Sequence, residues 1–187
     1  MSENQKNLHK ADAALKQFET EMDPERLREA YLALENVIVV EERDSARRSS
    51  LRRDSLDLWL HMLDLIDRFL DPQFDPNDVP ELRVQPPPDS DGKTYPAGSD
   101  PTLIKDPQSR AKYEKAIAAN LAKANNYRLQ INLRRLNQSI PERAESFIHK
   151  SYASTPEDQK ELRSAIDKII KNPARKAYLF KLFTPTS

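Results

Sequence analysis

The segment Leu56–Leu70, which reads LDLWLHMLDLIDRFL, decides the fold of this 187-residue chain. At about 100° per residue in a helix, its ten large apolar side chains cover most of the circumference and leave a narrow polar arc. The histidine and the four charged residues within it exclude a membrane-spanning helix. We therefore predict that this segment is a helix at the centre of the core, with neighbours on several sides.

The composition of the rest of the chain favours an all-α fold. Only two glycines occur, Gly92 and Gly98, and both lie in one segment. Extended β-structure usually needs more residues that tolerate positive φ in its turns. The chain has no cysteine, which excludes disulfides, thiol catalysis and cysteine-ligated zinc.

Two further helices are predicted before the central one. Apolar residues recur at steps of three and four over about 5–21 and again after Asp23-Pro24-Glu25, which has the residue types of a helix start. We predict a corner at 44–50, with Ser49 or Ser50 capping the central helix and the nearby arginines at the end of the preceding one. Residues 1–70 are thus predicted to form an N-terminal three-helix bundle.

The second half of the chain is predicted to consist of a linker and more helices. Residues 71–106 hold eight of the fourteen prolines and both glycines, which predicts a long, partly ordered crossover loop. A long bridging helix is predicted over about 107–138. Its apolar face changes sides, so we expect its first half to lie on the N-terminal helices and its second half to receive the C-terminal ones. Pro141, Pro156 and Pro173 are each predicted to start a short helix, which completes a C-terminal segment at 107–187.

Charge is distributed unevenly along the sequence. Residues 1–100 hold 13 basic and 22 acidic residues, whereas residues 101–187 hold 17 basic and 8 acidic residues. This asymmetry predicts a non-enzymatic interaction or scaffold protein with an acidic N-terminal half and a basic C-terminal half. A protein partner or self-association is the expected mode of action.

The alternative is a nucleic-acid-binding protein that uses the basic half. Phosphate binding needs basic side chains on one surface. The candidate residues for a nucleic acid or another partner are Lys112, Lys123, Arg128, Arg134, Arg135, Lys171, Arg175 and Lys176. The competing interpretation is that these charges are matched by the acidic half of the same chain or by another subunit.

A weaker alternative is a metal-dependent hydrolase. Asp57, His61 and Asp64 share one face of the central helix, and carboxylate and imidazole groups are ligands of divalent metals. The competing interpretation is a solvated face, because Arg53 and Arg68 stand four residues from Asp57 and Asp64. The sequence has no glycine-rich turn that exposes a serine and no phosphate-binding loop, so no cofactor is predicted and a non-enzyme is favoured.

Two further expectations concern regulation and location. Ser50 follows Arg47-Arg48-Ser49, a basic–serine pattern typical of protein kinase substrates, and is the candidate regulatory residue. The first residues, MSENQKNLHK, lack the apolar stretch of a signal peptide, which favours a cytoplasmic location.

Overall fold

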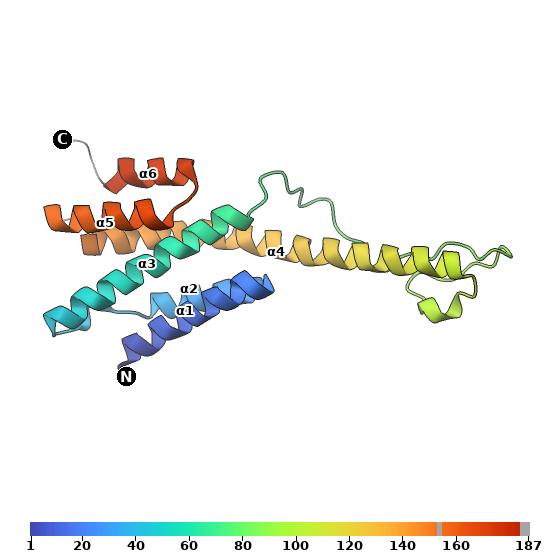
Figure 1. Cartoon of the computed structure of the whole chain (residues 1–187), viewed down its shortest axis with the longest axis horizontal. Helices are drawn as coiled ribbons and strands as arrows, with labels where there is room; N and C mark the ends of the chain where they lie inside the picture. Colours follow the sequence, from blue (N-terminus) through green and yellow to red (C-terminus); the bar gives the residue numbers. More distant parts are fainter. Residues whose placement is uncertain (153–154, 184–187) are drawn as a thin grey trace. The chain divides into compact units, whose positions relative to one another are not determined.

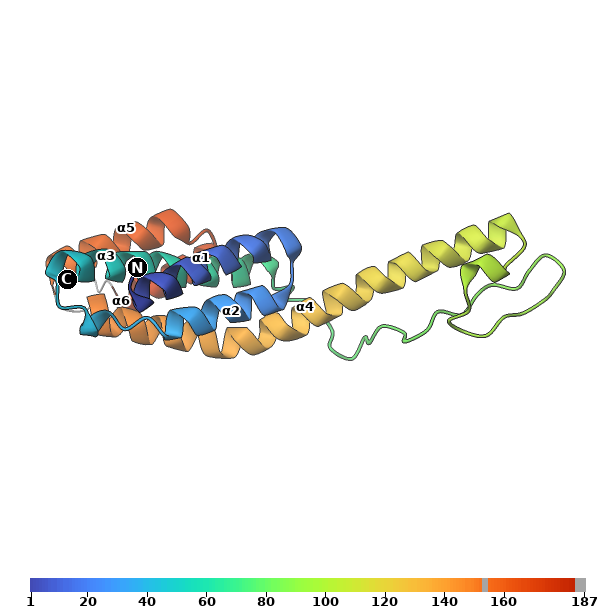
Figure 2. The same ribbon diagram turned by 90° about the horizontal axis from the view of Figure 1, so that it is seen from below.

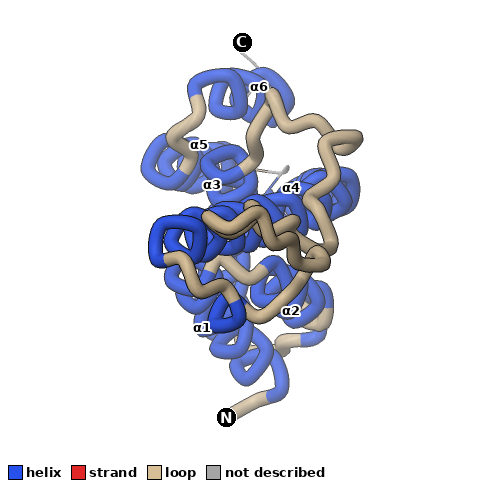
Figure 3. The backbone as a smooth tube through the Cα atoms, turned by 90° about the vertical axis from the view of Figure 1, so that its right-hand side faces the viewer, coloured by secondary structure: helices blue, strands red, loops and turns tan. Residues whose placement is uncertain are grey.

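The computed structural model describes residues 1–152 and 155–183, and all regular structure in those residues is helical (Figure 3). The predicted all-α class is confirmed. The helices are α1 (Glu3–Glu21), α2 (Pro24–Glu35), α3 (Ser45–Phe69), α4 (Pro107–Tyr152), α5 (Pro156–Ile169) and α6 (Pro173–Phe183), with short 3₁₀ helices η1 (Val39–Glu41) and η2 (Pro101–Leu103). Within the described ranges, no helix is both long enough and apolar enough to cross a bilayer.

The chain divides into two compact units. The first unit consists of Met1–Asp71 and Asn132–Ser187, and the second of Pro72–Ile131. The boundary falls inside α4, which contributes residues to both. Residues 107–131 belong to the same unit as 72–106, where Tyr113 of α4 shares a core with Tyr95 and Ile104. The predicted placement of the first half of the long helix on the N-terminal helices stays a prediction.

The first unit is built around α3, as its apolar circumference predicted. Helix α3 contacts α1 and α2 on one side and α5 on the other (Figure 1). Helices α1 and α2 lie side by side (Figure 2). The buried apolar residues of α3 are Leu51, Leu56, Trp59, Leu60, Met62, Leu63, Leu65 and Ile66. Helix α3 therefore buries side chains against α1 and α2 on one side and against α5 on the other.

The corner before α3 lies earlier than predicted. Helix α2 ends at Glu35, and α3 begins at Ser45 with Asp44 as its N-cap; the Asp44 side chain accepts a hydrogen bond from the Arg47 backbone N–H at 2.8 Å. The predicted caps at Ser49 or Ser50 were therefore wrong, since both residues lie inside α3. Aspartate is as good a cap as serine and adds a negative charge at the positive helix end, while the β-branched run at 37–40 disfavours continuation of α2.

Pro141 does not start a new helix, contrary to the prediction, but lies inside α4. A proline in a helix interior removes the N–H that would bond the carbonyl four residues earlier, and its ring crowds that carbonyl. Ile140, Ala144, Ile148 and Tyr152 nevertheless form one fully buried stripe through this position. Burial on both sides of the proline explains why the helix continues.

Replacing this proline tests that explanation. Pro141→Ala is expected to raise the free energy of unfolding by about 2 kcal/mol, because alanine restores the missing hydrogen bond and removes the clash. Urea unfolding followed by circular dichroism measures the change. The control is Pro156→Ala, at an exposed first helical position where proline is tolerated. A Pro141→Ala protein no more stable than the control would contradict the explanation.

The second unit has a small core. Tyr95, Ile104 and Tyr113 are buried, with Val84 and Ile117 packed against them. The Tyr113 hydroxyl donates to the Ser99 carbonyl at 2.8 Å. Aromatic residues also attach the start of the proline-rich segment to α4, since Phe74 packs edge-on against Tyr127 with ring centroids 5.4 Å apart.

In the same unit, a polar cluster joins the loop at 89–106 to the start of α4. The Tyr95 hydroxyl donates to Asp89 at 2.5 Å, and the Asp106 backbone N–H donates to the other Asp89 oxygen at 3.1 Å. The Asp89 carboxylate raises the pKa of Tyr95 to about 12. The same hydroxyl, with that backbone N–H, lowers the pKa of Asp89. Asp89 therefore fixes the loop at 89–106 against the start of α4.

Candidate interaction groove

The charge asymmetry of the sequence disappears within each unit. The first unit holds 22 basic and 22 acidic residues, and the second holds 8 of each. Chain segments of opposite sign are therefore combined in the same unit. This agrees with the interpretation that the basic half is matched by the acidic half of the same chain.

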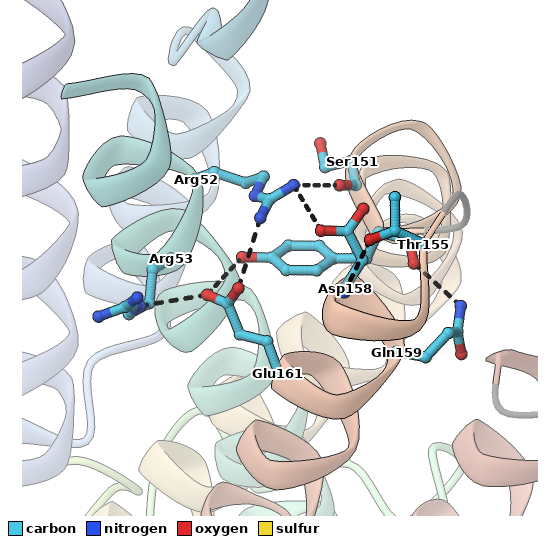
Figure 4. A network of polar contacts seen from close by, with 8 residues as sticks. Arg52, Arg53, Ser151, Thr155, Asp158, Gln159 and Glu161 are labelled. Atoms are coloured by element: carbon cyan, nitrogen blue, oxygen red, sulfur yellow. Dashed lines mark hydrogen bonds and ion pairs between the residues drawn. The ribbon is translucent and has the colours of Figure 1, made fainter. Parts of the chain in front are cut away.

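Ion pairs such as Arg175 with Asp67 and Arg143 with Glu35 join the basic half to the acidic half. A larger network of polar contacts, in which the cation comes from the acidic half, surrounds Arg52 of α3 (Figure 4). Its guanidinium lies 3.0 Å from Asp158 and 3.4 Å from Glu161, both on α5, and donates to the Ser151 carbonyl at 2.9 Å. It also lies 4.4 Å from the ring centroid of Tyr152. Burial and the nearby Glu161 raise the pKa of Tyr152. The network holds α5 against α3.

The eight basic candidates are divided between the units. Lys112, Lys123 and Arg128 belong to the second unit, whereas Arg134, Arg135, Lys171, Arg175 and Lys176 belong to the first. Several of them pair with carboxylates: Arg175 donates twice to Asp67 at 3.0 and 3.1 Å, Lys123 lies 2.8 Å from Asp78, and Lys176 lies 3.2 Å from Asp167. The set therefore does not form one surface of unpaired cations.

The metal candidates are used in other contacts. Both oxygens of Asp64 accept hydrogen bonds, from the Lys171 backbone N–H at 3.0 Å and from Arg68 at 2.9 Å. His61 Nε2 lies 3.5 Å from a Glu19 oxygen, and burial raises the pKa of Asp57. No three His, Asp or Glu side chains in the described residues are arranged to hold a metal ion. Asp57, His61 and Asp64 thus do not form a ligand set.

Ser50 is exposed near the start of α3. It lines a pocket of about 330 Å³ together with Arg47, Asp54 and the first residues of the chain. Its role as a regulatory residue stays a prediction.

A larger groove of about 510 Å³ lies in the first unit. One wall is the segment 34–40, which joins the end of α2 to η1, and the other wall is the last part of α4. Trp59 of α3 completes the lining. The α4 residues are Arg143, Ser146, Phe147, Lys150 and Ser151. The groove thus combines aromatic and aliphatic side chains with two cations.

The wall at 37–40 presents aliphatic side chains to solvent. Val40 is 82% exposed and Ile38 is 43% exposed, whereas Trp59 is only 4% exposed. Asn4 of α1 holds the segment in place, since its side chain accepts from the Ile38 N–H at 3.0 Å and donates to the Ile38 carbonyl at 3.2 Å. The exposed aliphatic residues are therefore positioned by the fold.

Charged groups lie at the α4 side of the groove. Arg143 lies 3.1 Å from Glu35, whose carboxylate also accepts a hydrogen bond from the Tyr31 hydroxyl at 2.8 Å. Burial, followed by this hydrogen bond, raises the pKa of Tyr31. Lys150 has no carboxylate partner in the described part of the chain. The lining therefore has one cation in excess.

None of the eight basic candidates lines this groove. The signal in the sequence was the run Val37-Ile38-Val39-Val40, four β-branched residues between two helices. A hydrophobic run does not itself show whether it is buried or exposed, so the site became visible only in the structure.

Comparison with known proteins found no match: no protein-family model, no curated protein and no solved structure resembles the chain.

Proposed function

We propose that this chain is a non-enzymatic protein-interaction module that binds a partner in the groove between residues 34–40 and the end of α4. The observation that carries the proposal is the exposure of Ile38 and Val40 beside the buried Trp59. Exposed apolar side chains that rim a preformed groove are typical of surfaces that bind another protein. A partner in the groove would remove these aliphatic side chains from water.

The charge distribution favours this function over nucleic-acid binding. A nucleic acid needs a surface of basic side chains that replace the counterions of the phosphates. Both units are neutral, and Lys123, Arg175 and Lys176 are paired with carboxylates. The metal-dependent hydrolase is disfavoured as well, because both oxygens of Asp64 already accept hydrogen bonds, from Arg68 and from the Lys171 backbone N–H.

The experiment is a pull-down from cells of the native source with the tagged full chain and its Val40→Asp variant. A charged side chain at this position would be buried without a partner in the complex, so the amount of a specific partner should fall about tenfold or more. The fold should be unaffected, because Val40 is mostly exposed. Quantitative mass spectrometry of the bound proteins measures the change.

The matched control is Val79→Asp, which makes the same substitution at an exposed valine in the second unit. This variant should retain the partner at the wild-type level. A set of bound proteins that does not depend on Val40 would refute the groove as the binding site.

A further inference from the structure

We infer, on the basis of the proposed function, that the groove binds an acidic peptide segment anchored by an aliphatic side chain. Two features of the lining identify this chemistry. One is the apolar floor and the other is the excess of positive charge at the α4 wall.

The apolar floor of the groove favours an aliphatic side chain as the anchor of the peptide. Trp59 and Phe147 line the groove beside the aliphatic wall at 37–40. The Trp59 ring is held in place by edge-to-face packing against Tyr31, with centroids 6.2 Å apart. A leucine- or isoleucine-sized side chain would pack on the partly buried Phe147 and the exposed Ile38 and Val40, above this fixed ring.

The basic side chains of the α4 wall favour a negatively charged peptide. Arg143 offsets the charge of Glu35, and Tyr31 already donates to that carboxylate. The Arg143 side chain is still largely exposed and has further N–H donors. Lys150 adds a cation with no carboxylate partner among the described residues. A carboxylate next to the anchor would therefore meet two donors, whereas a basic segment would be repelled.

The test uses the intrinsic fluorescence of Trp59, the only tryptophan of the chain. Three short peptides are titrated into the full chain. Each has the same leucine anchors, flanked by aspartates in the first, by asparagines in the second and by lysines in the third. We expect the aspartate peptide to change the fluorescence and to bind about tenfold tighter than the asparagine peptide, since it would form ion pairs with both Arg143 and Lys150.

The second part of the test reverses the charge of a residue that lines the groove. Lys150→Glu should weaken the aspartate peptide about tenfold or more and should strengthen the lysine peptide. The matched control is Lys10→Glu, at an exposed lysine of α1 outside the groove, which should change neither affinity by more than about twofold.

The outcomes separate this inference from the proposed function. Equal affinities for the aspartate and asparagine peptides, tighter binding of the lysine peptide, or no binding of any of the three would overturn the acidic partner. The Val40-dependent pull-down decides independently whether the groove binds a protein at all. An acidic-peptide preference that Lys150→Glu reverses would establish the inference.

Discussion

Leu60→Ala is expected to lower the free energy of unfolding of the first unit by about 2–5 kcal/mol. Leu60 lies in the middle of α3 and is 0% exposed. Truncation removes the apolar contacts of its side chain and leaves a cavity between helices that are fixed on both sides of α3. Urea unfolding followed by circular dichroism measures the loss.

The matched control is Leu82→Ala, because Leu82 is fully exposed in the second unit. The same truncation there removes no buried surface, so stability should change by less than about 0.5 kcal/mol. Equal effects of the two substitutions would show that α3 is not the centre of the core.

Arg52→Ala is expected to lower the free energy of unfolding by about 2 kcal/mol. The Arg52 side chain is 23% exposed and contacts Asp158, Glu161 and the Tyr152 ring. Removing one partner of a buried ion pair typically costs 3–5 kcal/mol, and we reduce this to ~2 kcal/mol because the group is partly exposed. The loss arises because the carboxylates of α5 then face each other without their shared cation.

Thermal unfolding of Arg52→Ala, Arg52→Lys and Arg48→Ala measures this effect. Lysine keeps the charge but not the planar fork that reaches several acceptors, so its stability should be intermediate. Arg48 is exposed in the first turn of α3, where a positive charge is unfavourable, and its removal should be neutral or slightly stabilising. If Arg52→Ala were as stable as Arg48→Ala, the network would not hold α5 against α3.

Local patterns predicted the helices of this protein well. The apolar circumference of Leu56–Leu70 predicted a central helix, and α3 is central because burying such a helix requires neighbours on several sides. Asp23-Pro24 predicted the start of α2, where the Asp23 side chain accepts from the Glu25 N–H at 3.1 Å. Apolar periodicity and N-capping both depend on residues within a few positions of one another, so they can be predicted from the spacing of residues in the sequence.

Local patterns failed where distant burial outweighed them. Pro141 has the residue type of a helix start, but the buried stripe from Ile140 to Tyr152 requires a continuous helix. Ser49 and Ser50 are good caps, but Asp44 stands earlier in the chain and caps α3 first. In each case a competing free-energy contribution of a few kcal/mol or less decided where the helix begins: burial on both sides of Pro141, and capping by Asp44.

The sequence by itself thus determined that the chain is all-helical, that α3 packs against helices on two sides and that the proline-rich segment has no long helix. Only the tertiary structure decided that the acidic and basic halves neutralise each other in both units, and that Ile38 and Val40 are exposed beside Trp59. The reason is physical. Helix formation depends on residues one or two turns apart, whereas ion pairing and exposure depend on which distant segments meet, as Arg52 meets Glu161.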